Sequence, residues 1–221
     1  MTTVKNILMA VTLLIPTSAL GSSINVLNAS FESNFDNWST SGGASGTENL
    51  NGSGLTPVAS DGVANAWLNG AAVVKQDLNS ITSPGSTIVG SQTYTLTVDV
   101  GDLNVFPPGP FSIWLYDVAT GNPLANANGT ASLTATPPSA GVYTPFSVTY
   151  TSQAAGDPSL GDQTGIGLTC VIGTVQTLMD NVRLTTNPVE TPEPSSLALA
   201  GLGVLGLGLF ARQRRQRAGA A

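Results

Sequence analysis

Alternating apolar and polar positions recur through the middle of the chain. Segments 93–100, 111–118 and 145–152 read TYTLTVDV, FSIWLYDV and PFSVTYTS, with an apolar or aromatic residue at every second position. This period of two is typical of half-buried strands. Shorter strand candidates are 65–69, 72–78, 165–172 and 179–185, and clusters typical of turns lie at 41–47, 104–110, 119–123 and 136–141. Because no segment between the chain ends keeps a helical period, the pattern predicts one all-β domain over 22–188, an antiparallel β-sandwich.

The N-terminus has the three parts of a secretory signal peptide. Lys5 supplies the positive region, residues 7–15 (ILMAVTLLI) are apolar, and 16–23 (PTSALGSS) offer small residues for cleavage after Ala19 or Gly21. The apolar run is shorter than the roughly 20 residues that cross a bilayer. The alternative is a buried N-terminal helix. We expect a signal peptide over 1–21 and export across the inner membrane.

Residues 189–221 form a second signal with three parts. The first part is the triplet Pro192, Glu193 and Pro194, and the second is an uncharged stretch at 195–211. The third is a basic cluster of Arg212, Arg214, Arg215 and Arg217. As a helix the 17 uncharged residues would be roughly 26 Å long, close to the thickness of a bilayer core. The arginines predict a cytoplasmic C-terminus, so that the domain between the two signals lies outside the inner membrane.

In this order the triplet, the apolar helix and the arginines resemble the PEP-CTERM sorting signal of Gram-negative bacteria. The resemblance implies a transient membrane anchor that an exosortase recognises and processes, and a final place at the cell surface or outside the cell. Proteins with this signal occur with exopolysaccharide and biofilm systems. An ordinary single-pass anchor is the alternative; a GPI signal fits less well, because it has a polar spacer and no terminal arginines.

Charge and composition restrict the function of the domain. Twelve acidic residues between Glu32 and Glu190 face only Lys75 and Arg183, which gives residues 22–190 a net charge of −10, against −6 for the whole chain. Nucleic acid is therefore not an expected partner, because phosphate contacts need clustered cations. The chain has no histidine, which excludes Ser-His-Asp catalysis, and its single cysteine, Cys170, cannot form an intrachain disulfide.

Four segments of the domain resemble jelly-roll carbohydrate-binding-like domains of the galactose-binding type. They are 26–38 (VLNASFESNFDNW), 61–78, 94–101 and 178–184 (LMDNVRL). The resemblance implies that the first and last strands lie near each other and hold a structural Ca²⁺ with Glu32 and Asp180 as carboxylate ligands, completed by backbone carbonyls. The alternative is that both side chains are solvated at a turn and a strand end.

Three aromatic residues are candidates for stacking on sugar rings. Trp114 and Tyr116 share a face opposite Ile113 and Leu115, and Trp67 has Asn65 and Asn69 two positions away on either side. Since either face of a strand in a two-sheet sandwich can be core, we expect Trp114 to belong to the core, which leaves Trp67 as the better sugar-binding candidate. We also expect Trp38 to be buried.

Catalysis is not expected. A glycoside hydrolase needs two suitably spaced carboxylates, and Asp99 with Asp102, or Asp157 with Asp162, lie in or beside predicted turns where solvated aspartate is common. Two non-enzymatic hypotheses remain open: a glycan-binding protein associated with extracellular polysaccharide, and a purely structural matrix component.

Overall fold

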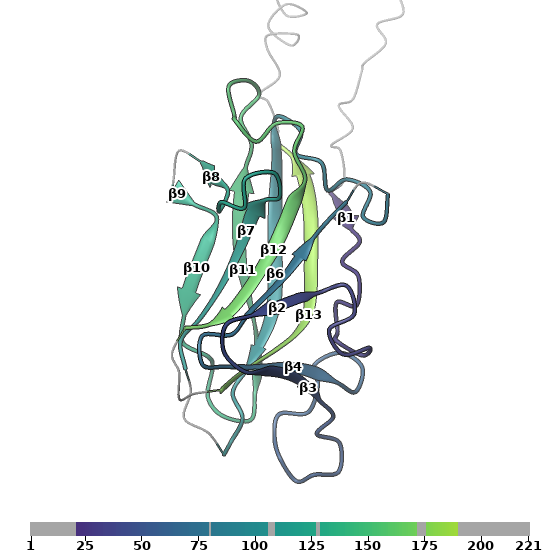
Figure 1. The fold of residues 1–221 in the computed structure, drawn as a ribbon, viewed down its shortest axis with the longest axis vertical. Helices are drawn as coiled ribbons and strands as arrows, with labels where there is room; N and C mark the ends of the chain where they lie inside the picture. The colour runs from purple at the N-terminus through teal and green to yellow at the C-terminus, as the bar shows by residue number, and fades with distance from the viewer. Residues whose placement is uncertain (1–20, 80, 106–108, 127–128, 172–175, 190–221) are drawn as a thin grey trace, which may run out of the picture. The chain divides into compact units, whose positions relative to one another are not determined.

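The computed structural model describes residues 21–79, 81–105, 109–126, 129–171 and 176–189, which form thirteen strands (Figure 1). Their bounds are β1 Ser22–Ile24, β2 Ser39–Ser41, β3 Ser45–Glu48, β4 Asn65–Asn69, β5 Val73–Asp77, β6 Gln92–Gly101, β7 Phe111–Asp117, β8 Ala125–Asn126, β9 Gly129–Thr130, β10 Ser132–Ala135, β11 Tyr143–Thr151, β12 Thr164–Cys170 and β13 Gln176–Pro188. Within these ranges no helix has the length and apolar character that a membrane crossing requires. The predicted signal peptide before residue 21 and the sorting helix with its arginines lie outside the described residues.

The strands form two large sheets and one small ribbon. A six-stranded sheet has the order β11-β6-β13-β4-β3, with β1 also paired to β13, and a five-stranded sheet has the order β10-β7-β12-β5-β2. Strands β8 and β9 form a two-stranded ribbon. Every strand pair among the described residues is antiparallel. The predicted antiparallel β-sandwich is therefore confirmed for the described part of the chain.

The alternating segments of the sequence supply the core between the sheets. In β6 the side chains of Tyr94, Leu96 and Val98 are fully buried, while the intervening threonines are half-buried. Strand β7 buries Ile113 and Leu115 in the same way. Each such side chain contributes roughly 1.5–3 kcal/mol through burial. The alternation therefore fixes which face of each strand packs inward.

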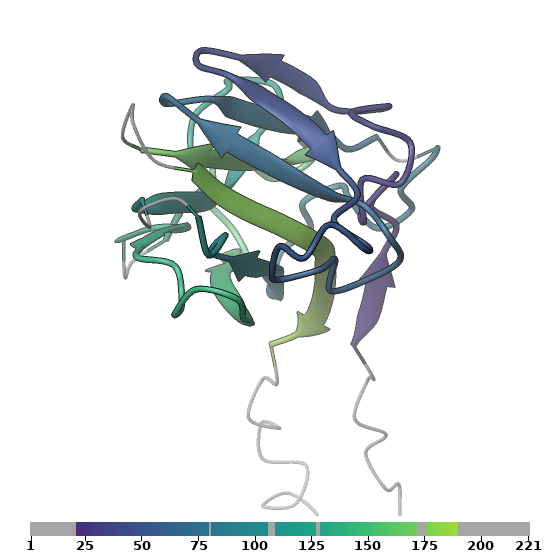
Figure 2. The same cartoon turned by 90° about the horizontal axis from the view of Figure 1, so that it is seen from below.

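Strand β13 is central to the six-stranded sheet. Its two halves pair with β4 and β1 on one edge, while β6 runs along the other, so the first and last strands lie side by side (Figures 1 and 2). The register shifts between Asp180 and Arg183, where Asn181 has φ of +49° and the Val182 amide donates to the Ala29 carbonyl. Bulges of this kind redirect side chains. Here Asp180, before the bulge, lies opposite Asp99 of β6 in register, and Arg183, after it, forms an ion pair with Asp99.

The segment between β1 and β2 is pinned by buried aromatic residues. Phe31 is fully buried, and its ring centroid lies 5.3 Å from that of Trp38, which is 7% exposed. The Trp38 indole N–H donates to the carbonyls of Leu27 and Asn28. The prediction that Trp38 belongs to the core is confirmed.

The short polar strands were not predicted. Residues 41–47 were expected to be a turn, but β3 begins at Ser45 and pairs with β4 along its whole length. Strands β2 and β10 consist of serine, threonine, leucine and alanine with little apolar pattern. Such strands form because a neighbouring strand offers hydrogen-bonding partners, and the sequence alone does not show which strand is the neighbour.

Candidate functional site

Trp114 and Tyr116 lie against two glycines of the neighbouring strand. In the register of β7 and β12, Trp114 is opposite Gly167 and Tyr116 is opposite Gly165. A β-carbon added to Gly167 would come within 2.0 Å of the Trp114 ring, and one added to Gly165 within 2.2 Å of the Tyr116 ring. The rings therefore occupy the space where side chains of β12 would stand. We call these four residues the aromatic platform.

The aromatic platform lies on the outer face of the five-stranded sheet. Ile113 and Leu115 take the inward positions of β7 and are fully buried, so the residues between them point the other way. Trp114 is half-buried, whereas Tyr116 is only 3% exposed. The expectation that Trp114 belongs to the core is therefore wrong, because the inward positions of β7 are already filled.

A lysine completes the platform. Lys75 on β5 is opposite Gly167 in register, and its Nζ lies 4.8 Å from the centroid of the Tyr116 ring and 6.0 Å from that of the Trp114 ring. These distances suit cation–π attraction. The Tyr116 hydroxyl donates a hydrogen bond to the Asp77 carboxylate. Burial, and then this contact with Asp77, raise the pKa of Tyr116, so the phenol stays protonated.

Trp67 repeats the same arrangement on the other sheet. It is half-buried on β4, opposite Gly46 of β3, and a β-carbon on Gly46 would come within 2.7 Å of its ring. The Trp67 side chain packs against a small second apolar cluster that includes Leu50 and Leu178. Trp67 and Trp114 thus belong to different sheets, and the structure does not bring them together into one site.

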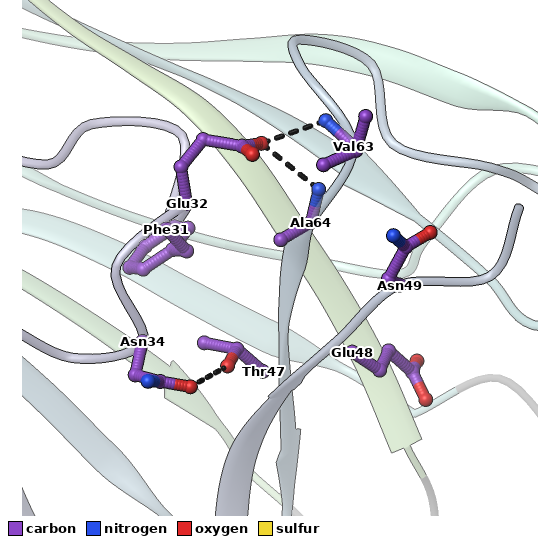
Figure 3. A pocket seen from close by; sticks show the side chains of 8 residues that line it. All are labelled: Phe31, Glu32, Asn34, Thr47, Glu48, Asn49, Val63 and Ala64. Atoms are coloured by element: carbon purple, nitrogen blue, oxygen red, sulfur yellow. Dashed lines mark hydrogen bonds between the residues drawn. The ribbon is translucent and has the colours of Figure 1, made fainter.

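Glu32 and Asp180 both hold the segment 60–64. Glu32 Oε1 accepts from the amides of Val63 and Ala64 at 2.7 and 2.9 Å (Figure 3). Asp180 Oδ2 accepts from the amides of Ser60 and Asp61 at 2.7 and 2.9 Å. Its Oδ1 accepts from the Asn181 amide at 2.7 Å. The two predicted metal ligands are thus anchored to one segment through its backbone amides.

The pKa values of Asp180 and Asp99 are shifted in opposite directions. Asp180 is fully buried, and burial raises its pKa to about 6, although backbone hydrogen bonds partly oppose the rise. Asp99 is opposite it in register on β6 and forms an ion pair of 2.7 Å with Arg183. Burial also acts to raise the pKa of Asp99, but hydrogen bonds from Arg183, Asn181 and Ser60 outweigh it and lower the pKa.

No group of three or more metal-ligating Cys, Asp or Glu side chains converges within the described ranges. The oxygens of Asp180 face backbone N–H groups, whose positive ends would also face a cation placed there. Glu32 directs one oxygen to such groups. Calcium binding by Glu32 and Asp180 stays a prediction.

Two shallow pockets lie on the described surface. One, of about 280 Å³, is lined by Phe31, Glu32, Asn34, Thr47, Glu48, Asn49, Val63 and Ala64. In Figure 3 the Glu48 carboxylate points away from Glu32. Burial raises the pKa of Glu48. The other, of about 340 Å³, is lined by Thr130, Ser132, Leu133, Ser147, Val148, Thr149 and Thr151. We call this second pocket, which is lined by residues of β9, β10 and β11, the edge groove.

The other aspartates considered for catalysis have separate surroundings. Asp157 accepts hydrogen bonds from the Tyr150 hydroxyl and from the amides of Gln153 and Ser159, which fixes the loop after β11. Asp102 is 2% exposed, and burial raises its pKa. Neither residue lines either of the two pockets.

Sequence reasoning missed Lys75, Gly165 and Gly167. Their signal was present in part, because glycine occupies alternate positions of the 165–172 segment where outward side chains are expected. That these glycines lie beneath Trp114 and Tyr116 depends on the pairing of β7 with β12, which are separated by about fifty residues of chain.

Comparisons with solved structures give the same fold. A cyclase from Fischerella sp. TAU aligns with a TM-score of 0.62 at 22% identity, over 78% of this chain and all of that one. A Stig cyclase from the same organism, in complex with (3Z)-3-(1-methyl-2-pyrrolidinylidene)-3H-indole, aligns at 0.59 and 20%, over 77% and 100%. The carbohydrate-binding module TmCBM61, in complex with β-1,4-galactotriose, aligns at 0.51 and 14%, over 74% and 98%. At these identities the likeness is one of fold.

Two family models match the sequence, whereas the search of curated proteins gave no match. The PEP-CTERM protein-sorting motif matches residues 190–215, which confirms the resemblance of the tail. The motif is consistent with export and transient membrane anchoring. The second model, described as HpiC1 cyclase, matches residues 21–185 and so covers nearly the whole sandwich. The chain therefore belongs to the HpiC1-like family.

Proposed function

We propose that this protein is an exported, exosortase-sorted component of the cell surface or extracellular matrix that binds polysaccharide without catalysis. The observation that carries the proposal is the half-buried indole of Trp114, which lies over Gly167 on the outer face of a sheet. A flat aromatic ring held in one orientation is the surface on which a sugar ring stacks.

The surroundings of the ring support this reading. Ser132 is opposite Trp114 on β10, and Ser112 and Thr169 occupy the neighbouring outward positions of β7 and β12. The Thr169 hydroxyl donates to the Ala72 carbonyl and Ser112 shares a hydrogen bond with Thr134, so their remaining lone pairs can accept from sugar hydroxyls. The likeness in fold to a module that binds β-1,4-galactotriose is compatible with this role.

Acid catalysis is a second candidate, favoured by the family description and by Asp180. A buried carboxyl with a pKa of about 6 can hold a proton near neutral pH. Against this role, its oxygens already accept three backbone hydrogen bonds. Ligand binding at the aromatic platform is therefore the better-supported function.

Trp114→Ala tests the binding proposal, and Trp67→Ala is its matched control, because both indoles are half-buried over a glycine. In affinity electrophoresis through galactan and through polygalacturonate, we expect Trp114→Ala to abolish retention and Trp67→Ala to keep it. The reverse result would move the site to the six-stranded sheet. Absence of retention of the unmodified protein by either polysaccharide would favour the structural role.

A further inference from the structure

The two cations of the sandwich have different surroundings. Arg183 is neutralised by Asp99 at 2.7 Å, the one ion pair within the described residues. The Lys75 ammonium has no hydrogen-bond acceptor in the part of the chain that the structure describes, and it lies over the rings of Tyr116 and Trp114. Lys75 is thus a positive charge on the aromatic platform with its donors available.

Asp77 forms no salt bridge with Lys75 within the described residues, where Arg183 and Asp99 form the one such pair. Asp77 is two residues along β5 from Lys75, and its carboxylate accepts the hydrogen bond of the Tyr116 hydroxyl. The contact between Asp77 and Tyr116 also fixes the ring on which the ammonium rests.

Lys75 belongs to a row of outward residues that crosses the sheet. In register, Lys75 on β5 lies opposite Gly167 on β12, Gly167 opposite Trp114 on β7, and Trp114 opposite Ser132 on β10. Three strand spacings of 4.7–4.9 Å make this row about 14 Å long. Ser132 also lines the edge groove, so the row continues into a pocket bordered by hydroxyl groups. An extended ligand several sugar rings long can lie along it.

A carboxylate is the group that complements this row. A sugar ring stacked on Trp114 would place a carboxylate at its rim within reach of an ammonium 6.0 Å from the ring centroid. Charge-assisted hydrogen bonds of this kind are shorter and stronger than neutral ones. We infer that the polysaccharide is acidic, with uronate carboxylates bound by Lys75 while the sugar stacks on Trp114. This inference rests on the proposed function and names its ligand class.

The charge of the rest of the molecule makes this inference easy to test. With a net charge of −10 over residues 22–190, the sandwich repels a polyanion at long range. The four arginines at 212–217 attract one, but they are the same in every variant, so a difference in retention between variants reports on the sandwich.

The experiment compares polygalacturonate with its fully methyl-esterified form, which has the same sugar backbone without the charge. The full chain, Lys75→Gln and Lys75→Arg are compared by affinity electrophoresis, with thermal melts as the check on folding. We expect the unmodified protein to bind polygalacturonate about tenfold or more tightly than the ester, as a hydrogen bond between charged groups provides. Lys75→Gln should bring the ratio of the two affinities, polygalacturonate to ester, close to one. Lys75→Arg should keep most of the preference for polygalacturonate.

Each contrary outcome has a distinct meaning. Equal binding of both polymers, abolished by Trp114→Ala, would overturn the acidic ligand and leave the stacking site in place. A preference for polygalacturonate that Lys75→Gln does not change would overturn the role of Lys75. Retention of neither polymer, with galactan also unbound, would overturn the polysaccharide proposal itself.

Discussion

The Trp114 ring lies over Gly167, its cross-strand partner, and takes the place of the side chain that Gly167 lacks. The same relationship joins Tyr116 to Gly165 and Trp67 to Gly46. Glycine weakens a strand because it has no side chain to pack, and a ring laid over it restores that packing. The three rings therefore contribute to stability whether or not a ligand binds.

The first prediction concerns this pairing. Gly167→Ala should lower the free energy of unfolding by about 1–3 kcal/mol, because the new β-carbon must push the Trp114 ring off the sheet. Ser132→Ala, on the other side of Trp114, is the control and should change it by less than about 0.5 kcal/mol. Urea denaturation measures both. Equal stability of Gly167→Ala and the unmodified protein would show that the ring does not rest on Gly167.

The second prediction concerns pH. The pKa of Asp180 is about 6 in the fold and 3.8 by its ordinary value, so folding favours the protonated carboxyl. Its contribution to stability is complete below about pH 4 and is lost as the pH rises through 6, by about 3 kcal/mol at most. Asp180→Asn should flatten the dependence of the free energy of unfolding on pH between 4 and 6.

Asp99 acts in a separate window. Its pKa is lowered, so its contribution is present above the ordinary value of 3.8 and is lost only as the pH falls through its folded pKa. Denaturation measured from pH 4 upward therefore leaves out Asp99. Burial also raises the pKa values of Glu48 and Asp102, so the contribution of Asp180 is the difference in slope between Asp180→Asn and the unmodified protein. An unchanged slope in Asp180→Asn would assign the pH dependence to another group.

The third prediction concerns calcium. If Glu32 and Asp180 bind Ca²⁺, the melting temperature should rise with calcium concentration, because a ligand that binds only the folded state stabilises it. Glu32→Ala should abolish the increment, whereas Glu48→Ala, which lines the same pocket, should keep it. The calcium-dependent rise in melting temperature is compared between variants, rather than the melting temperature itself. Glu32→Ala also removes the hydrogen bonds to the amides of Val63 and Ala64, which by itself changes the melting temperature. If a chelator leaves the melting curve of the unmodified protein unchanged, the calcium site is ruled out.

The fourth prediction concerns the sorting motif. Protein recovered from the cell surface should lack residues 195–221, because the matched motif at 190–215 implies processing by an exosortase. Intact-mass analysis measures this directly. Recovery of the uncleaved tail at the surface would indicate a permanent anchor.

The sequence predicted those strands in which one face is apolar and the other is polar. Strands β6, β7 and β11 were recognisable because apolar residues alternate with threonine and serine. Strands β2 and β3 were not, because residues such as Ser45 and Gly46 have no apolar face and pair only because a neighbouring strand is present.

The candidate sites were predictable to a smaller extent. Glu32 and Asp180 were identified as candidate ligands from a family resemblance. Both accept hydrogen bonds from the backbone amides of segment 60–64, and no sequence pattern reveals these partners. The orientation of Trp114 depended on how β7 fills the core, and its glycine partner on strand pairing. Both depend on tertiary structure rather than on local preference.

The central place of β13 has a mechanical consequence. Pro188 ends this strand two residues before the sorting motif, so tension on a C-terminal tether enters the domain along β13. The backbone hydrogen bonds to β6, and to β1 at Ser22 and Ile24, lie across that direction and share the load in shear. Strands at the sheet edge, such as β3 and β11, do not carry the force first. While the tail is in place, a domain pulled through it would thus resist extension along a strand that pairs with three others, β1, β4 and β6.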